Sequence, residues 1–202
     1  CSSDLFNWRL EYTKKWLLNF HKFLKHANKN KIEVIVGISP GLDFDFKSYA
    51  KGNKKDIELL IKKLKIFLSY EARHIAILFD DIPNDFNLRV KDEAEGVIHA
   101  KIINEIEKKI DLSIFSVPRI YSDELISENK NYLVDFLKTI NKNIQVFFTG
   151  KTVVSNNFDS NQEVIVEKIN ENKVVNWDNY YANDYCPNRL FIGPWENKNL
   201  IE

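Results

Sequence analysis

The sequence predicts an α/β fold in which helices cover a parallel β-sheet. Short apolar segments typical of strands alternate strictly with amphipathic segments typical of helices along the 202 residues. Such alternation predicts a parallel sheet with right-handed crossovers, either open and doubly wound or closed into a (β/α)₈ barrel. The six glycines include no G-x-G spacing, so the glycine-rich turn of an open nucleotide-binding sheet is missing. The chain also supplies five strands, fewer than a complete barrel needs.

Five segments have the β-branched, nearly continuous apolar character of strands that are covered on both faces. In chain order they are 32–38, 74–79, 112–116, 144–148 and 174–177. Pro40 ends the first of them, because proline has no N–H group with which to continue a ladder.

A helix is predicted before each strand, because apolar residues recur there at helical spacing. The predicted helices are 10–28, 55–69, 90–110, 131–140 and 161–170. No internal repeat or low-complexity linker divides these units, so we expect one domain over 1–202. The residues after 180 are rich in loop-forming types.

Composition excludes several classes of function. Lys plus Arg and Asp plus Glu both number 29, which leaves no net charge to attract nucleic acid or an anionic membrane. Cys1 and Cys186 are too few for a disulfide framework or a cysteine metal cluster. No apolar run approaches the roughly 20 residues of a membrane helix, so a soluble chain is predicted. Because the chain lacks Met and starts at Cys1, we expect a fragment whose native N-terminus lies upstream.

Polar and aromatic residues follow the predicted strands, where parallel α/β folds carry their chemistry. The sharpest feature is Asp80-Asp81, directly after an apolar strand. Like charges this close raise the pKa of one member, giving one carboxylic acid and one carboxylate for acid–base catalysis. The alternative is a helix cap beside a solvated acid. A magnesium site of Asp80, Asp81 and Asp85, with Asp45 or Asp178, is also conceivable, but its spacing matches no known motif.

A second cluster combines aromatic rings with amides and acids in 177–185, Trp-Asp-Asn-Tyr-Tyr-Ala-Asn-Asp-Tyr. Flat rings pack on the apolar faces of sugars, and Asp and Asn bind sugar hydroxyls. A polar surface loop is the alternative, but such loops seldom hold this many aromatic side chains. The mixture favours a sugar site.

Two segments resemble the hallmark motifs of glycoside hydrolase family 84, which comprises protein O-GlcNAcases and bacterial β-N-acetylglucosaminidases, some of them named hyaluronidases. They are 76–82, Ala-Ile-Leu-Phe-Asp-Asp-Ile, and the 177–185 cluster. Three further segments follow the family order: 38–43, 149–155 and 189–194. The resemblance implies a partial (β/α)₈ TIM barrel with about five of eight units, strands about three to seven, the first two and the last strand being missing.

The resemblance also implies retaining, substrate-assisted hydrolysis of terminal β-linked N-acetylglucosamine through an oxazoline. Asp80 would orient the acetamido N–H and Asp81 would be the general acid and base. Substrate-binding roles would fall to Tyr121, Thr149, Val153, Trp177, Asn179 and Asp184. The expected partner is a glycoprotein or glycan that bears N-acetylglucosamine, and no cofactor, metal, nucleic acid or membrane is implied.

Two other functions remain open at this point. A catalytically inactive sugar-binding or scaffold domain of the same fold would usually lose one aspartate of the pair, and both are present. A magnesium-dependent hydrolase would lose activity with EDTA. The lysine and the last asparagine that the family uses to bind sugar hydroxyls have no counterpart in these residues, so the activity of the fragment alone is a separate question.

Overall fold

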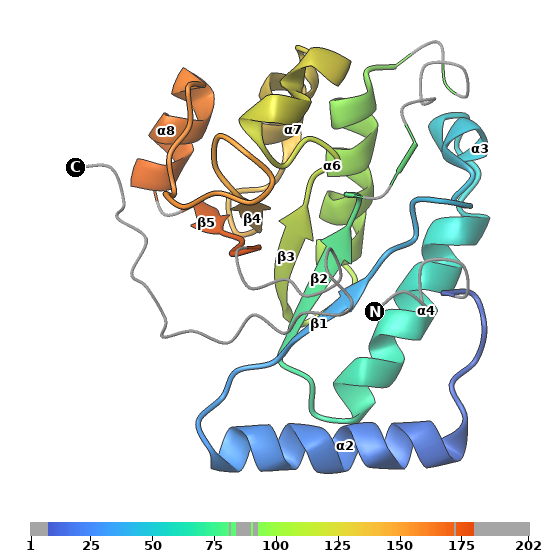
Figure 1. Ribbon diagram of the computed structural model, residues 1–202. Coiled ribbons are helices and arrows are strands. Elements are labelled where there is room, and N and C mark those ends of the chain that lie inside the picture. Colours follow the sequence, from blue (N-terminus) through green and yellow to red (C-terminus); the bar gives the residue numbers. More distant parts are fainter. Residues whose placement is uncertain (1–7, 81, 84–89, 91–92, 172, 180–202) are drawn as a thin grey trace, which may run out of the picture.

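The structure is a computed structural model that describes residues 8–80, 82–83, 90, 93–171 and 173–179. Five strands form one sheet in the order β1-β2-β3-β4-β5, and every neighbouring pair is parallel (Figure 1). The strands are β1 Ile35–Ile38, β2 His74–Leu78, β3 Ser113–Val117, β4 Gln145–Phe148 and β5 Val174–Asn176. Four lie within the predicted segments and β3 extends one residue beyond its segment, to Val117, so the parallel α/β sheet is confirmed.

The helices follow the predicted alternation. They are α2 Lys14–Lys29, α4 Lys55–Ser69, α6 Glu95–Glu107, α7 Tyr132–Thr139 and α8 Glu163–Asn170. Helices α4, α6, α7 and α8 pack against one another in sequence along one face of the sheet (Figure 1). In that figure α2 lies across the lower end of α4, where Tyr12 and Phe20 both pack on Phe67.

Two short helices were not predicted. Helix α3, Phe46–Ala50, starts where the Asp45 side chain accepts a hydrogen bond from the Ser48 N–H at 2.9 Å. The 3₁₀ helix η1, Asp123–Glu128, follows the carboxyl end of β3. Both are too short to produce a hydrophobic period in the sequence.

The core lies between the sheet and its helices. In the paired rows of the ladder, Ile77 of β2 aligns with Ser116 of β3 and Val146 of β4, and all three are fully buried. On the opposite face Phe115 of β3 and Gln145 and Phe147 of β4 are only half-buried, although Ala76 of β2 is buried there. The sheet therefore has a helix-covered face and a more open face, which we call the concave face.

Among the described helices, α6 and α7 have the most extensive contact. A Cβ placed on Gly96 of α6 would lie 2.3 Å from the Tyr132 carbonyl oxygen and 2.9 Å from the Phe136 nitrogen. Only glycine lets the two backbones approach this closely. Among the described residues, no helix has the length and apolar character to span a bilayer.

Candidate active site

Four of the predicted site residues follow strands of the parallel sheet. Asp80 follows β2, Tyr121 follows β3, Thr149 follows β4 and Trp177 follows β5. Parallel strands end at the same edge of a sheet, so these residues share its carboxyl edge. This is the edge at which the sequence predicted the chemistry.

Asp80 is oriented by the residue before it. The Phe79 N–H donates to the Val117 carbonyl at 2.9 Å, which extends the β2–β3 ladder by one residue. The Phe79 ring is fully buried in the helix layer and stacks on His99 with ring centroids 4.4 Å apart. Asp80 is half-buried and lies in the turn that follows, where the Ile82 N–H donates to the Phe79 carbonyl at 3.3 Å.

Asp81 and Asp184 lie outside the described residues. The shared pocket of the two neighbouring aspartates, and the binding of sugar hydroxyls by Asp184, therefore stay predictions.

Thr149 joins the ends of β3 and β4. Its N–H donates to the Tyr121 carbonyl at 2.9 Å, and its hydroxyl lies 3.2 Å from the same oxygen and 2.7 Å from the Thr152 carbonyl. Ser122 and Gly150 form a parallel bridge just beyond. Thr149 is buried, with its hydroxyl turned back to the main chain, so it holds the shape of this edge.

Trp177 and Asn179 bring β5 and the residues that follow it into the same cluster. The Trp177 N–H donates to the Phe148 carbonyl at 2.9 Å, and its ring lies 6.1 Å from the Tyr121 ring between centroids. The Asn179 amide donates to the Val153 carbonyl at 3.2 Å. The structure thus joins Tyr121, Thr149, Val153, Trp177 and Asn179 by direct contacts or through the loop 149–155.

The residues that hold this loop were not predicted. The Val153 N–H donates to Glu124 Oε1 at 2.7 Å. The main-chain N–H groups of Asp123 and Glu124 donate to the carbonyls of Gly150 and Lys151 at 3.0 and 3.1 Å. The available signal was the acidic pair Asp123-Glu124, which comes two residues after Tyr121.

Aromatic rings continue from this cluster along the sheet. Trp177 meets Phe147 edge-on at 5.7 Å, Phe147 stacks on Phe115 at 5.4 Å, and Phe115 meets His74 at 6.1 Å. The upper part of this series, at Trp177 and Tyr121, offers flat apolar surface beside amide and carboxylate groups. That combination is suited to binding a sugar ring.

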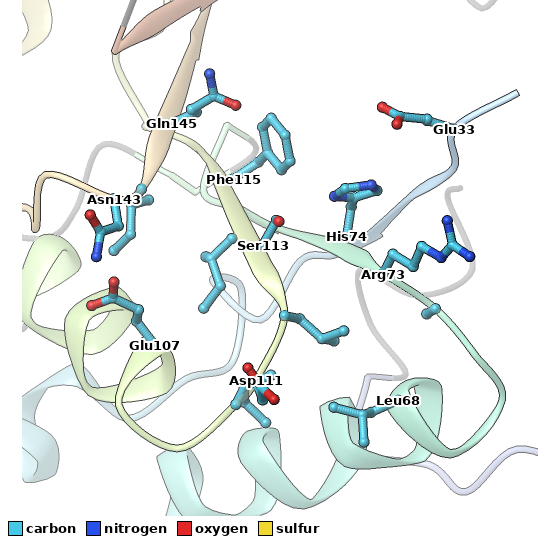
Figure 2. Close-up of a pocket in the computed structure, with 15 residues that line it drawn as sticks. Glu33, Leu68, Arg73, His74, Glu107, Asp111, Ser113, Phe115, Asn143 and Gln145 are labelled. Atoms are coloured by element: carbon cyan, nitrogen blue, oxygen red, sulfur yellow. The ribbon is translucent and has the colours of Figure 1, made fainter.

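A cavity of about 1020 Å³ lies at the opposite edge of the sheet (Figure 2). Its lining includes the amino ends of β2, β3 and β4, with residues such as His74, Ser113 and Gln145. None of the predicted site residues lines it. Because barrels carry their chemistry at the carboxyl edge, the size of this cavity does not make it the active site.

Candidate metal ligands have other contacts. Asp45 caps α3 and its N–H donates to Asp56 at 2.9 Å. Among the described residues, no group of three or more His, Cys, Asp or Glu side chains is arranged to hold a metal ion. Asp81 and Asp85 lie outside those residues.

A model of the β-N-acetylglucosaminidase family matches residues 3–200. The chain belongs to this family. The resemblance to glycoside hydrolase family 84 is therefore confirmed, and the homologous proteins are glycoside hydrolases.

Two mammalian proteins are similar in sequence to this chain over most of its length. Protein O-GlcNAcase of Mus musculus is 31% identical over 199 residues, and protein O-GlcNAcase of Rattus norvegicus is 30% identical over 199 residues. Each alignment includes 95% of this chain and 21% of the relative. The chain thus spans about a fifth of the length of these two proteins.

Two solved structures of the family are similar to the chain. The structure of CpGH84B superposes with a TM-score of 0.75 at 29% identity, over 95% of this chain and 34% of that one. A mutant of the Thermobaculum terrenum O-GlcNAc hydrolase superposes with a TM-score of 0.72 at 26% identity, over 95% of this chain and 42% of that one. Both are TIM-barrel proteins, which confirms that the five-stranded sheet is part of a (β/α)₈ barrel.

Proposed function

We propose that the protein is a retaining β-N-acetylglucosaminidase of the O-GlcNAcase type, which hydrolyses terminal β-linked N-acetylglucosamine. One observation supports this most strongly: Tyr121, Trp177 and Asn179 gather with the loop 149–155 at the sheet edge that also carries Asp80. Family membership supports the same activity. We further propose that β1 to β5 correspond to barrel strands three to seven.

In the proposed reaction the acetamido oxygen of the substrate attacks the anomeric carbon as the glycosidic bond breaks. Asp80 accepts the acetamido N–H, which aligns the oxygen and stabilises the positive charge that develops on the amide. Asp81 donates its proton to the leaving oxygen, and the product of this step is an oxazoline. Asp81 then takes a proton from water, which attacks the anomeric carbon and restores the acetamide with retained configuration.

The remaining residues would bind the sugar. Tyr121 would donate a hydrogen bond to the acetamido oxygen, and Trp177 would pack against the acetamido group. Asn179, together with Thr149 and Val153 of the loop, would line the same pocket. Asp184 would bind sugar hydroxyls. The substrate would be a glycoprotein or glycan with a terminal N-acetylglucosamine.

The leaving group provides the test. In the full-length protein, Asp81→Asn should lower kcat/KM by about 10²–10⁴-fold for a glycoside with a poor leaving group. It should affect an activated aryl glycoside much less, because such a leaving group departs without a proton. Asp80→Asn should lower kcat/KM for both substrates, because the oxazoline step is needed in each case.

Asp111→Asn is the matched control, since Asp111 is an exposed aspartate at the opposite edge of the sheet. Its kinetics should equal those of the unmodified protein. Equal and mild effects of the Asp80 and Asp81 changes would contradict the assigned roles. Loss of activity with EDTA would instead indicate a magnesium-dependent hydrolase, and an inactive full-length protein that still binds N-acetylglucosamine would indicate a sugar-binding domain.

A further inference from the structure

A buried ion pair lies behind the carboxyl ends of β2 and β3. Arg119, two residues before Tyr121, holds both carboxylate oxygens of Glu95 through Nε and Nη2, the latter at 2.9 Å. Both side chains are about 1% exposed. Glu128 of η1 binds the remaining nitrogen, Nη1, at 2.5 Å, and Asn129 donates to Glu95 at 3.0 Å. Arg119 therefore fixes α6 and η1 to the end of β3.

Arg119 keeps its positive charge although its side chain is buried. Burial lowers the pKa of the Arg119 guanidinium, and the hydrogen bonds and charge of Glu95 more than offset this effect, so the pKa is raised overall. A guanidinium that bridges two carboxylates has a fixed geometry, because its planar fork allows few alternative arrangements.

A second set of contacts joins the same arginine to the end of β2. The main-chain N–H of Arg119 donates to the Tyr132 hydroxyl at 3.0 Å, and that hydroxyl lies 2.9 Å from His99 Nδ1. Tyr132 and His99 are both fully buried. His99 stacks on Phe79, the residue before Asp80. Glu95 and His99 lie one turn apart on α6, so this helix faces both strand ends.

We propose that Glu95, His99, Arg119 and Tyr132, together called the Arg119 network, are positioning residues that set the distance and orientation between Asp80 and Tyr121. The inference rests on the proposed function. In that function Asp80 and Tyr121 act on the same acetamido group from neighbouring strands, so a small displacement of either one misaligns the attacking oxygen. A misplacement of about 1 Å can cost about 10²-fold in rate.

Within the part of the chain that the structure describes, the Arg119 network contacts the candidate site through the carboxyl ends of β2 and β3. Neither Arg119 nor Tyr132 projects onto the concave face, because the Arg119 side chain packs against α6 and η1 and Tyr132 packs against Phe136 of α7. Its effect should thus appear in the reaction rate and in the placement of Asp80 and Tyr121, with little effect on substrate binding.

The decisive variant is Tyr132→Phe, which removes the hydroxyl and keeps the ring. In the full-length protein it should lower kcat for an aryl N-acetylglucosaminide by about 10-fold, with KM changed by less than about 2-fold. Crystal structures of the unmodified protein and of Tyr132→Phe should differ in the relative position of Asp80 and Tyr121 by about 0.5 Å or more.

Tyr49→Phe is the matched control. The Tyr49 hydroxyl donates to Glu105 of α6 at 3.0 Å, and Tyr49 is buried in the core at 8% exposure. Both variants should lose a comparable amount of Tm, but Tyr49→Phe should keep kcat, because its hydrogen bond lies away from the strand ends.

Arg119→Lys repeats the test if Tyr132→Phe does not fold, because it keeps a positive charge and the main-chain N–H while losing the fork. Unchanged kcat together with unchanged positions of Asp80 and Tyr121 would overturn the inference. A full-length protein without activity would refute the proposed function, and the crystal structures would still decide whether the network controls the two positions.

Discussion

Glu124 illustrates how a single side chain outside the strands shapes the candidate site. The Glu124 carboxylate accepts a hydrogen bond from the Val153 N–H, and the Val153 carbonyl accepts one from the Asn179 side-chain amide. The orientation of Asn179 thus depends on a carboxylate that would not itself touch the sugar. Val153 acts in this arrangement through its main chain.

Replacement of Glu124 tests this dependence. Glu124→Ala should raise KM for an N-acetylglucosaminide by about 5-fold, because losing a hydrogen bond to a charged group weakens the loop by about 1 kcal/mol after allowance for its exposure. Glu124→Gln keeps an acceptor oxygen and should restore most of the affinity. Steady-state kinetics on both variants measure this, and an unchanged KM in Glu124→Ala would show that the carboxylate does not hold the loop.

At the scale of elements, the contact between α6 and α7 controls how closely the helices cover β2 and β3. Gly96 permits this contact because a side chain there would meet the main chain of α7. A main chain in a packed helix cannot move aside as a flexible side chain can.

Gly96→Ala should lower the free energy of unfolding by about 3 kcal/mol, as expected for overpacking against rigid neighbours. Gly37→Ala is the control, because its Cβ would meet only the Leu78 side chain, whose Cδ1 at 2.9 Å can rotate away. That change should cost less than about 1 kcal/mol. Denaturant unfolding measures both, and similar losses would argue against a rigid α6–α7 contact.

The extent to which the sequence predicted the elements depended on their length. The strands were recognisable because each is a continuous apolar run between polar segments. Helix ends were less accurate: α2 was predicted from residue 10 but begins at Lys14, where the Thr13 hydroxyl accepts the Trp16 N–H at 3.2 Å. Likewise α6 was predicted from residue 90 and begins at Glu95. The short helix α3 depends on its Asp45 cap, and η1 has no side-chain cap but is held by main-chain bonds to Gly150 and Lys151, which periodicity does not reveal.

At the scale of the whole molecule, long-range polar contacts tie separate units together. Arg9 binds Asp43 after β1 at 2.7 Å and Asp56 at the start of α4 through two hydrogen bonds of 2.8 and 2.9 Å. The Arg9 side chain also lies over the Trp8 ring, which is fully buried. The hydrogen bonds from Arg9 lower the pKa of the Asp56 carboxyl.

This pKa shift predicts a dependence of stability on pH. The folded pKa of Asp56 lies below its unfolded value, so the stabilisation is complete above the unfolded value, about 3.9, and is lost as the pH falls through the folded value. Asp56→Asn should lower the free energy of unfolding at pH 7 by about 1–2 kcal/mol and flatten its decline below about pH 5.

Glu58→Gln is the control for the pH experiment, since Glu58 is an exposed carboxylate on the same helix. Its unfolding curve should keep the pH dependence of the unmodified protein. An unchanged acid slope in Asp56→Asn would show that Arg9 and Asp56 do not stabilise the fold.

The candidate site was predictable where its residues follow strands, and not where they come together through tertiary contacts. Asp80, Tyr121 and Trp177 each follow an apolar run, so their shared edge could be inferred from the order of the strands. The pairing of Arg119 with Glu95 could not, because the two residues are 24 positions apart and nothing in the local pattern of either indicates the other. A lone arginine between Pro118 and Ile120 was the remaining signal.

The two edges of the parallel sheet differ in what they can accept. At the carboxyl edge, the candidate site is assembled from side chains that follow four successive strands. The amino edge carries the cavity of Figure 2, and no proposed catalytic group lines it. The length of a five-residue strand such as β2 separates the two edges. A dye or affinity tag attached near Asp111 or Asn143 would therefore lie at the opposite edge of the sheet from the proposed sugar site. The amino edge is therefore the side from which the molecule can be immobilised or labelled while its pocket stays accessible.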